Sequence, residues 1–162
     1  MSIQKVRAYL AQFGMEEKVR ELEDSSATVD LAAQALGVIP ARIAKTLSFH
    51  TPEGCMLIVL AGDAKIDNGK FKHRFGYKAR MLSAQEALDM TGHAVGGVCP
   101  FALPEGVEVY TDCSLQRFDT VFPACGSSNS AIELTCQQLF TLSGSKEWVD
   151  VSKGWQLESD KL

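Results

Sequence analysis

Hydrophobic residues at the start of the chain recur with the spacing of one buried helix face. Ile3, Val6, Leu10 and Phe13 follow this period, so the first segment is predicted to be an amphipathic helix that ends at Gly14. Capping residues at the N-terminal ends and glycines near the C-terminal ends indicate further helices. These helices are expected over residues 28–36, 67–75, 83–90 and 135–144.

Short apolar runs between turn signals predict the strands. The clearest pair is 46–49 and 55–60, which the turn at 51–54 joins into a hairpin. A second pair, 120–124 and 131–134, flanks the sequence Gly126-Ser127-Ser128-Asn129. Other strands are expected over residues 18–23, 78–82, 107–111 and 148–151, and single helical turns over 39–44 and 114–118. The polar tail from Lys153 onward is expected to be frayed.

The order of these elements indicates the fold class. Short helices are interspersed with hairpin-type strand pairs, which is typical of an α+β domain with a mixed, largely antiparallel sheet. No repeat or linker divides the pattern, so residues 1–162 are expected to form one domain. The strict βαβ alternation, the GxxxxGK[ST] loop and the GxGxxG fingerprint of nucleotide-binding folds are all missing from the sequence.

Composition narrows the class of protein further. The chain has 162 residues, of which 46% are hydrophobic and 22% charged, so a full core is expected and wholesale disorder is not. No apolar run is long enough to span a membrane, and the N-terminus lacks the apolar stretch of a signal peptide, so we expect a cytoplasmic protein without membrane contact.

Charge and cysteine content limit the partners. The net charge is −4, which argues against a general polyanion binder, although the segment 65–80 is locally basic. That segment would either contact nucleic acid or form a solvated helix face. The five cysteines include no closely spaced pair, and the histidines do not stand at ligand spacing. We therefore expect reduced cysteines, no metal and no cofactor.

The segment from Thr91 to Phe101, TGHAVGGVCPF, is the strongest candidate for chemistry. Its glycines allow backbone conformations closed to other residues, and Pro100 fixes the direction in which the chain leaves. A loop of this kind can present backbone N–H groups to an ester carbonyl or an oxyanion at close range. The alternative is a long surface turn.

Four other places carry candidate side chains, each with a simpler alternative. Lys45 lies at the junction of a helical turn and a strand, where it would enter a cleft or extend outward to solvent. Cys99 with His93 would form a nucleophile and its base, or the thiol would merely fill space. The turn at 126–129 would bind a ligand or simply link two strands. Asp63 and Asp67 would be paired acids, or a turn residue and a helix N-cap.

These segments together resemble a known family. Residues 28–38, the Ile43-Ala44-Lys45-Thr46-Leu47 piece, the glycine loop up to Phe101 and the segment 126–134 stand in the order and spacing of the YbaK/ProX family. That family consists of aminoacyl-tRNA deacylases related to the editing insertion of bacterial prolyl-tRNA synthetase. The resemblance covers roughly residues 22–151. It implies a compact α+β domain with a mixed sheet or partial barrel, and hydrolysis of mischarged tRNA without a metal.

The resemblance also implies roles for individual residues. The signature lysine corresponds to Lys45 and would engage the tRNA 3′ end. The family's glycine-x-x-x-proline loop corresponds to residues 96–100, and a later glycine-containing turn corresponds to Gly126 and Ser127. The implied catalytic residues are Lys45, Gly96, Gly97, Val98, Cys99 and Pro100, and the implied substrate-binding residues are Thr46, His93, Phe101, Gly126 and Ser127.

The chain departs from the family at positions that bear on specificity. Many members have serine in place of Cys99 and glycine in place of Ala102, and basic residues are common at the turn that here contains Ser127. The amino acid removed and the tRNA selected are therefore open, with alanine, serine or cysteine on tRNA(Pro) as the natural candidates.

On this hypothesis Lys45 fixes the CCA end, N–H groups from Gly97 to Cys99 polarise the ester carbonyl, and water attacks. An aminoacyl-tRNA synthetase is a further possible partner. Three alternatives remain: a non-catalytic module that binds tRNA ends or a synthetase, a thiol-dependent hydrolase built on Cys99, and a structural or interaction protein with an apolar patch and no cleft.

Overall fold

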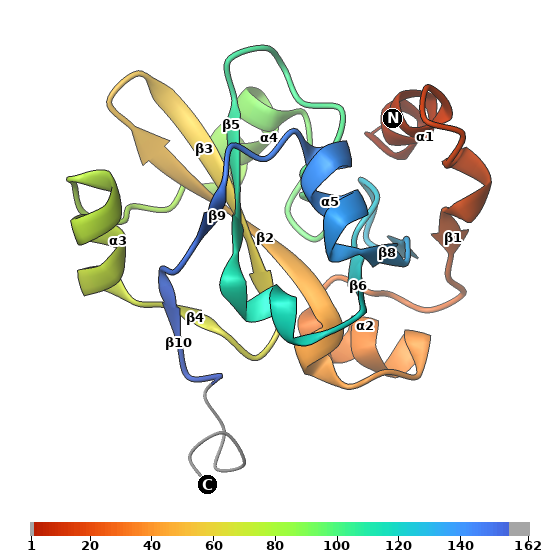
Figure 1. The fold of residues 1–162 in the computed structure, drawn as a ribbon. Coiled ribbons are helices and arrows are strands. Elements are labelled where there is room, and N and C mark those ends of the chain that lie inside the picture. The colour runs from red at the N-terminus through yellow and green to blue at the C-terminus, as the bar shows by residue number, and fades with distance from the viewer. Residues whose placement is uncertain (1, 156–162) are drawn as a thin grey trace, which may run out of the picture.

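The structure, a computed structural model, describes residues 2–155 and is built around a curled six-stranded sheet (Figure 1). The strand order is β8-β6-β2-β3-β5-β9. The strands of this sheet are β2 (Ile43–Thr51), β3 (Gly54–Ala61), β5 (Glu108–Asp112), β6 (Thr120–Pro123), β8 (Leu134–Thr135) and β9 (Trp148–Val149).

The sheet is mixed, as the sequence predicts. β2 and β3 form the predicted antiparallel hairpin, in which Lys45 is opposite Leu60, and β6 pairs antiparallel with β8. The other neighbours, β2 with β6, β3 with β5 and β5 with β9, are parallel. Every residue of β3 from Cys55 to Ala61 is buried, because elements cover both faces of the central strands. The predicted α+β class is confirmed.

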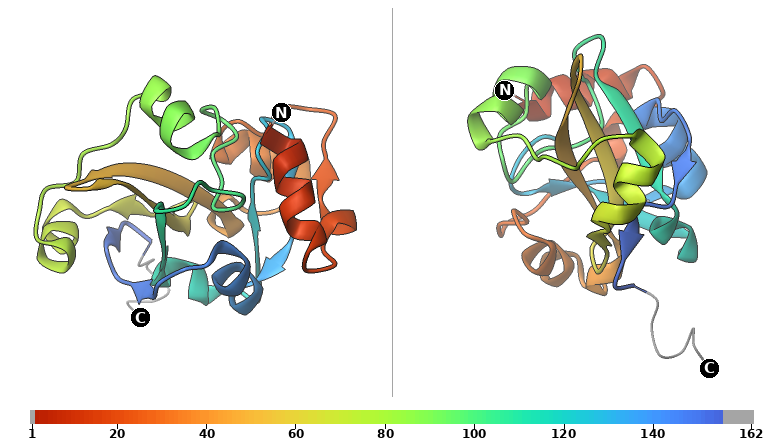
Figure 2. Two further views of the ribbon diagram at one scale, coloured as in Figure 1. Left: turned by 90° about the horizontal axis from the view of Figure 1, so that it is seen from above. Right: turned by 90° about the vertical axis from the view of Figure 1, so that its left-hand side faces the viewer.

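Five short α-helices surround the sheet within the described residues (Figure 2). α4 and α5 lie on opposite sides of the β2–β3 hairpin, and α1 and α3 lie at opposite ends of the molecule. Both predicted capping boxes are present, at Ser83 with Glu86 and at Thr135 with Gln138. The helices are α1 (Ser2–Ala11), α2 (Val29–Leu36), α3 (Asn68–Phe75), α4 (Ala84–Thr91) and α5 (Cys136–Ser143).

Short elements connect this framework. They are the 3-10 turns η1 (Glu16–Lys18), η2 (Pro40–Arg42) and η3 (Cys113–Arg117), and the two-residue strands β1 (Arg20–Glu21), β4 (Lys65–Ile66), β7 (Ser130–Ala131) and β10 (Ser152–Lys153). β1 pairs with β7, and β4 pairs with β10. None of the helices in the described part of the chain is long and apolar enough to cross a membrane.

Three local predictions are wrong. The segment 78–82 forms no strand, and only an isolated bridge joins Met81 to Phe49. The segment 131–134 is not one strand: Ala131 belongs to β7, which pairs with β1, whereas Leu134 begins β8, which pairs antiparallel with β6. Lys153 belongs to β10 rather than to a frayed tail, and the rest of that prediction, from residue 156 onward, lies outside the described residues.

Candidate functional site

A cavity of about 310 Å³ opens beside the first half of β2. Its walls come from the start of α2, residues 43–48 of β2, the segment that leads into α4 together with Ala87, the loop residues Val95, Gly96 and Val98, and the β6–β7 region. Most of the lining side chains are apolar, and Lys45 is the one titratable residue that the described chain contributes to these walls. The cavity contradicts the interaction-protein alternative, which predicts no cleft.

Lys45 is the third residue of β2 and is half-buried on the cavity wall. Its Nζ donates hydrogen bonds to the carbonyl oxygens of Gly62, at 3.3 Å, and Ala64, at 2.5 Å. Burial lowers the pKa of the Lys45 ammonium group, the charge of Asp63 raises it, and Lys65 lowers it. An ammonium group has three donors, so one N–H remains for a ligand oxygen.

Thr46, the next residue of β2, also lines the cavity. Its Oγ1 is the one side-chain oxygen or nitrogen atom in the described chain that is buried without a hydrogen-bond partner. A buried hydroxyl without a partner is unfavourable by about 1–3 kcal/mol. A ligand with a polar group at this point would therefore gain a hydrogen bond that the empty site lacks.

The glycine loop contributes Val95, Gly96 and Val98 to the cavity. Gly96 has a φ of 95°, a left-handed conformation that favours glycine. Gly97 is needed for a different reason, because a Cβ there would lie 2.8 Å from the Ser127 backbone N. The Gly97 N–H donates to the Ala94 carbonyl at 2.9 Å, so it is engaged within the loop and would have to leave this partner to polarise an ester.

Below the loop lies a buried cluster of His93, Cys99 and Phe101, none of which lines the cavity. His93 Nε2 is 2.8 Å from the Phe101 carbonyl oxygen, and Nδ1 contacts the Ser2 hydroxyl. A carbonyl oxygen can only accept, so Nε2 carries the proton and Nδ1 accepts from Ser2. Burial lowers the pKa of His93, which keeps the ring neutral.

This cluster contradicts the thiol-hydrolase alternative. The Cys99 Sγ is 3.6 Å from His93 Nε2, but that nitrogen already carries a proton and has no lone pair to take another. Burial raises the pKa of the Cys99 thiol to about 12, so the thiol stays protonated. Cys99, His93 and Phe101 therefore pack beneath the site, and none of them lines the cavity, although His93 and Phe101 were predicted to contact the substrate.

The other predicted residues of the loop and the later turn also support the cavity from outside. Pro100 is buried and does not line it. The Ser127 hydroxyl donates to Asn129 Oδ1 and lies 2.8 Å from Ser130 Oγ, and Gly126 packs against Ser2. From this turn region the cavity is lined by Ser130 rather than by the predicted Gly126 and Ser127. Ser130 was not singled out in the sequence, where it was one of several polar turn residues.

Sequence reasoning also missed the wall that α2 provides. Ala27, Thr28 and Val29 line the cavity, together with Phe122 of β6 and Met81. The only available signal was Thr28, whose hydroxyl accepts from the Leu31 N–H as the N-cap of α2. Small apolar residues such as Ala27 are common in helices and loops, so their position on a cavity wall leaves no mark in the sequence.

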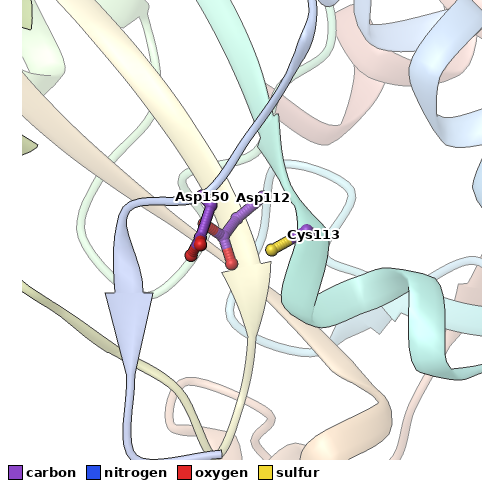
Figure 3. Close-up of side chains that lie close together, drawn as sticks. All are labelled: Asp112, Cys113 and Asp150. Carbon is purple, nitrogen blue, oxygen red and sulfur yellow. The ribbon is translucent and has the colours of Figure 1, made fainter. Parts of the chain in front are cut away.

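Asp112, Cys113 and Asp150 form a separate cluster whose potential ligand atoms lie within 4.8 Å of one another (Figure 3). Hydrogen bonds and an ion pair within the protein explain why these side chains lie close together. The Asp112 carboxylate accepts from the N–H groups of Ser114 and Val151, and Asp150 pairs with the Lys70 ammonium group. Burial raises the pKa of the Cys113 thiol to about 12, whereas metal binding requires a thiolate.

Several of the remaining charged candidates are paired or act as a helix cap. Asp67 is the N-cap of α3, as one alternative predicted, while Asp63 pairs with Arg117. In the basic segment 65–80, Lys70 pairs with Asp150 and Arg74 with Glu147.

Comparison with known proteins identifies the family. The family described as "Aminoacyl-tRNA editing domain" matches residues 23–142. The chain is 57% identical over 157 residues to the Bacillus subtilis (strain 168) protein described as "Uncharacterized protein YwhH", covering 96% of this chain and 100% of that one. It is 31% identical over 114 residues to a proline–tRNA ligase of Halalkalibacterium halodurans, covering 68% of this chain and 20% of the ligase.

A solved structure agrees with these matches. It is described as "a putative trans-editing enzyme for prolyl tRNA synthetase", and it superposes with a TM-score of 0.85 at 30% identity, covering 94% of this chain and 98% of that one. The resemblance to the YbaK/ProX deacylases that the sequence predicts is confirmed, and the chain belongs to the aminoacyl-tRNA editing domain family.

Proposed function

We propose that the protein is a trans-editing hydrolase that removes a wrongly attached small amino acid from mischarged tRNA, with tRNA(Pro) as the tRNA. The observation that carries this proposal is the cavity, whose walls include Lys45, with one ammonium N–H free, and Thr46, whose hydroxyl has no partner in the described chain. The relationship to a region of proline–tRNA ligase and to a trans-editing structure supports the choice of tRNA.

The size and lining of the cavity suit a small amino acid. A volume of about 310 Å³ is at the lower end for small-molecule sites, so it fits an aminoacyl group and only the adjoining part of the terminal nucleotide. An apolar pocket separates substrates that differ by one methylene by only about 1–3 kcal/mol, which is why a second, editing site is useful. Alanine, serine and cysteine are the amino acids we expect.

The residues of the site divide the work of ester hydrolysis. Two Lys45 donors hold the Gly62 and Ala64 carbonyls, and the third binds a phosphate or ribose oxygen of the terminal nucleotide. The Val98 N–H polarises the ester carbonyl, which is worth about 3 kcal/mol when well placed. We assign this role to Val98 alone, since the Gly97 N–H is engaged and Cys99 does not line the cavity.

Water supplies the nucleophile. Its oxygen adds to the ester carbonyl carbon, the bond from that carbon to the ribose oxygen breaks, and the ribose leaves as a hydroxyl with one proton. The described cavity walls contain no histidine, cysteine or carboxylate. The attacking water is therefore oriented by the substrate's own amino, hydroxyl or thiol group, which also favours some amino acids over others.

A deacylation panel tests the proposal. Purified protein is mixed with Ala-, Ser-, Thr-, Cys- and Pro-charged tRNA(Pro), and loss of the ester is followed against buffer alone. We expect rapid loss from one or two mischarged species, with Pro-tRNA spared. A flat panel, with folded protein and intact tRNA, would contradict the proposal and favour a module that binds tRNA ends or a synthetase without turnover.

Two variants test the site on the best substrate of the panel. Lys45→Ala is expected to lower kcat/KM by roughly 10- to 100-fold, because hydrogen bonds from a charged donor are worth about 1.5–3 kcal/mol. Thr46→Val, which has nearly the same shape, is expected to lower kcat/KM by roughly 2- to 10-fold without loss of stability, since its hydroxyl has no partner in the protein. Thr46→Ser keeps the hydroxyl and serves as the control. Full activity of Lys45→Ala on every substrate would remove Lys45 from the mechanism.

A further inference from the structure

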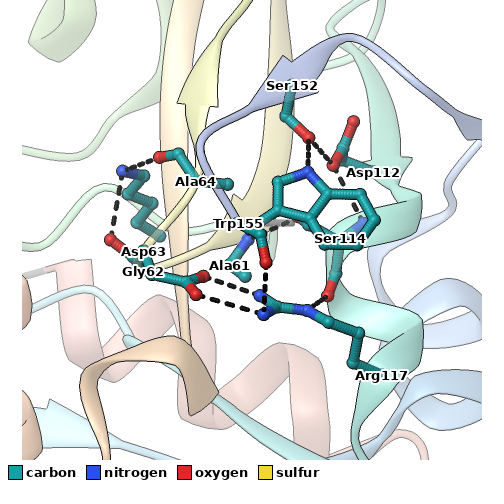
Figure 4. Close-up of polar contacts among 10 residues, drawn as sticks. Ala61, Gly62, Asp63, Ala64, Asp112, Ser114, Arg117, Ser152 and Trp155 are labelled. Atoms are coloured by element: carbon teal, nitrogen blue, oxygen red, sulfur yellow. Dashed lines mark hydrogen bonds and ion pairs between the residues drawn. The ribbon is translucent and has the colours of Figure 1, made fainter. Parts of the chain in front are cut away.

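Lys45 is held by a turn that is anchored from outside the cavity. Residues 61–64 connect β3 to β4, and the Gly62 and Ala64 carbonyls of this turn accept from the Lys45 ammonium group. Asp63 stands between these two carbonyls. Its carboxylate meets the Arg117 guanidinium group in two hydrogen bonds, Nη2 to Oδ1 at 2.6 Å and Nη1 to Oδ2 at 3.1 Å (Figure 4).

Arg117 is fixed on all sides. Its Nε donates to the Ser114 carbonyl at 2.8 Å, and the aromatic rings of Phe118 and Trp155 lie 4.8 and 4.9 Å from the guanidinium carbon. Trp155 is itself held, because its Nε1 donates to Ser152 Oγ at 2.8 Å. The Arg117 and Asp63 side chains are only 18% and 24% exposed, so this ion pair is better shielded from solvent than an ordinary surface pair.

The backbone of the turn has little freedom apart from this ion pair. A Cβ on Gly62 would lie 2.1 Å from the Pro40 carbonyl oxygen, so the turn is pressed against η2, the segment that leads into β2. The Ala61 N–H donates to Ser114 Oγ at 3.0 Å, which ties the start of the turn to η3. The bidentate ion pair fixes the residue between the two carbonyls, because a guanidinium fork matches a carboxylate in one plane only.

We propose that Asp63 and Arg117 are positioning residues for Lys45: their ion pair fixes the turn whose carbonyls aim the ammonium group into the cavity, and Asp63 supplies the negative charge that accompanies it. This inference rests on the proposed function in one respect, namely that Lys45 binds the tRNA. The charges that face Lys45 are Asp63, which raises its pKa, and Lys65, which lowers it, against a larger lowering by burial. Loss of the Asp63 charge therefore lowers the pKa of Lys45.

The first test measures Lys45 directly and needs no substrate. Lysine labelled with ¹³C at Cε is incorporated, the Lys45 signal is assigned by its absence in Lys45→Arg, and its midpoint is followed by NMR over pH. Asp63→Asn keeps the shape and an acceptor for Arg117 but removes the charge, so we expect a lower midpoint. Glu147→Gln removes the charge from the Arg74–Glu147 ion pair on the α3 side and should leave the midpoint unchanged.

The second test is the pH profile of deacylation with the mischarged tRNA that the wild type hydrolyses best. We expect Asp63→Asn to lower kcat/KM by roughly tenfold, within the hundredfold that a misplacement of about 1 Å can cost, and to move the alkaline limb to lower pH. Arg117→Lys keeps a positive charge without the fork, so it should lower kcat while the alkaline limb stays in place. For Asp63→Asn, a loss of activity with the alkaline limb in its wild-type place would mean a purely structural role for Asp63.

The outcomes separate this inference from the proposed function. If the wild type hydrolyses no aminoacyl-tRNA, the proposed function fails and the NMR midpoint alone decides the role of Asp63. An unchanged midpoint in Asp63→Asn, or an unchanged kcat/KM in an active enzyme, overturns the positioning role. If Arg117→Lys does not fold, the isosteric Asp63→Asn still gives the answer.

Discussion

The loop between α4 and β5 has two faces with opposite chemistry. Val95 and Val98 line the cavity, and the Val95 side chain is 68% exposed. His93 and Cys99, a few residues away on the other face, are 1% and 0% exposed. The histidine and cysteine, residue types usually linked to catalysis, therefore lie on the buried, closed face of the loop, while aliphatic residues and glycine line the cavity.

The comparison shows that an inventory of reactive side chains is misleading for this site. On the closed face both ring nitrogens of His93 have partners and the Cys99 thiol stays protonated. On the cavity side, the proposed chemistry uses the loop backbone, Lys45 and the unpartnered Thr46 hydroxyl. Substitutions that affect one face and spare the other are the way to test this division.

The largest effect is expected from Gly97→Ala, which would push the glycine loop away from the turn at Gly126 and Ser127. The added Cβ would lie 2.8 Å from the Ser127 N and 2.9 Å from the Gly126 carbonyl carbon. Both are backbone atoms, so relief of the clash requires a shift of the main chain. We expect a loss of about 1–3 kcal/mol in the free energy of unfolding and loss of most deacylation. Urea unfolding and the tRNA assay measure both effects.

Gly54→Ala is the matched control for that variant. Gly54 has open space around it, so its stability should change by less than about 0.5 kcal/mol and its activity should not change. Equal behaviour of the two variants would mean that the close approach of the loop to the turn has no importance.

A smaller effect is expected from Cys99→Ala, which changes the closed face alone. Removal of the buried sulfur should destabilise the protein by about 1 kcal/mol, through lost packing, and leave kcat/KM within about twofold. Native Cys99 should resist iodoacetamide at neutral pH because burial raises its pKa to about 12. Fast alkylation of Cys99 with parallel loss of activity would restore the thiol mechanism.

The smallest expected effect is a decrease in the free energy of unfolding at acidic pH, which comes from His93. Burial lowers the pKa of His93 in the folded state, whereas in the unfolded chain it titrates near about 6.5. As pH falls below that value the unfolded state binds the proton first, so the free energy of unfolding decreases down to the folded pKa. Unfolding at pH 7 and pH 5.5 should show this loss in the wild type.

His93→Gln should reduce that difference between the two pH values, while the exposed His73→Gln should keep it. If both variants retain the full difference, the buried ring is not its source.

The helices and the central hairpin could be predicted because their signals are local. Thr28, Ser83 and Thr135 mark the helix starts by hydrogen bonds to residues three positions later. Strand pairing in the second half could not be predicted, because β7 finds its partner in β1, more than a hundred residues away. No local pattern distinguishes that partner from β6.

The candidate site shows the same division. Lys45, Thr46, Gly96 and Val98 were predicted and line the cavity. His93, Phe101, Gly126 and Ser127 were also predicted as contacts and do not line it, because the path of the folded loop and turn decides which of their residues meet the cavity. Ala27 and Phe122 went unnoticed, since a lining role depends on elements that meet only in the folded chain.

The sequence by itself determined the elements, the α+β class and the family, because capping, periodicity and the order of motifs act over short distances. The tertiary structure alone decided which face of the glycine loop meets the cavity, that Cys99 is inert and that Asp63 pairs with Arg117 behind Lys45. Burial and charge depend on atoms that distant segments bring together, and these atoms set the pKa values and the free donors of the site.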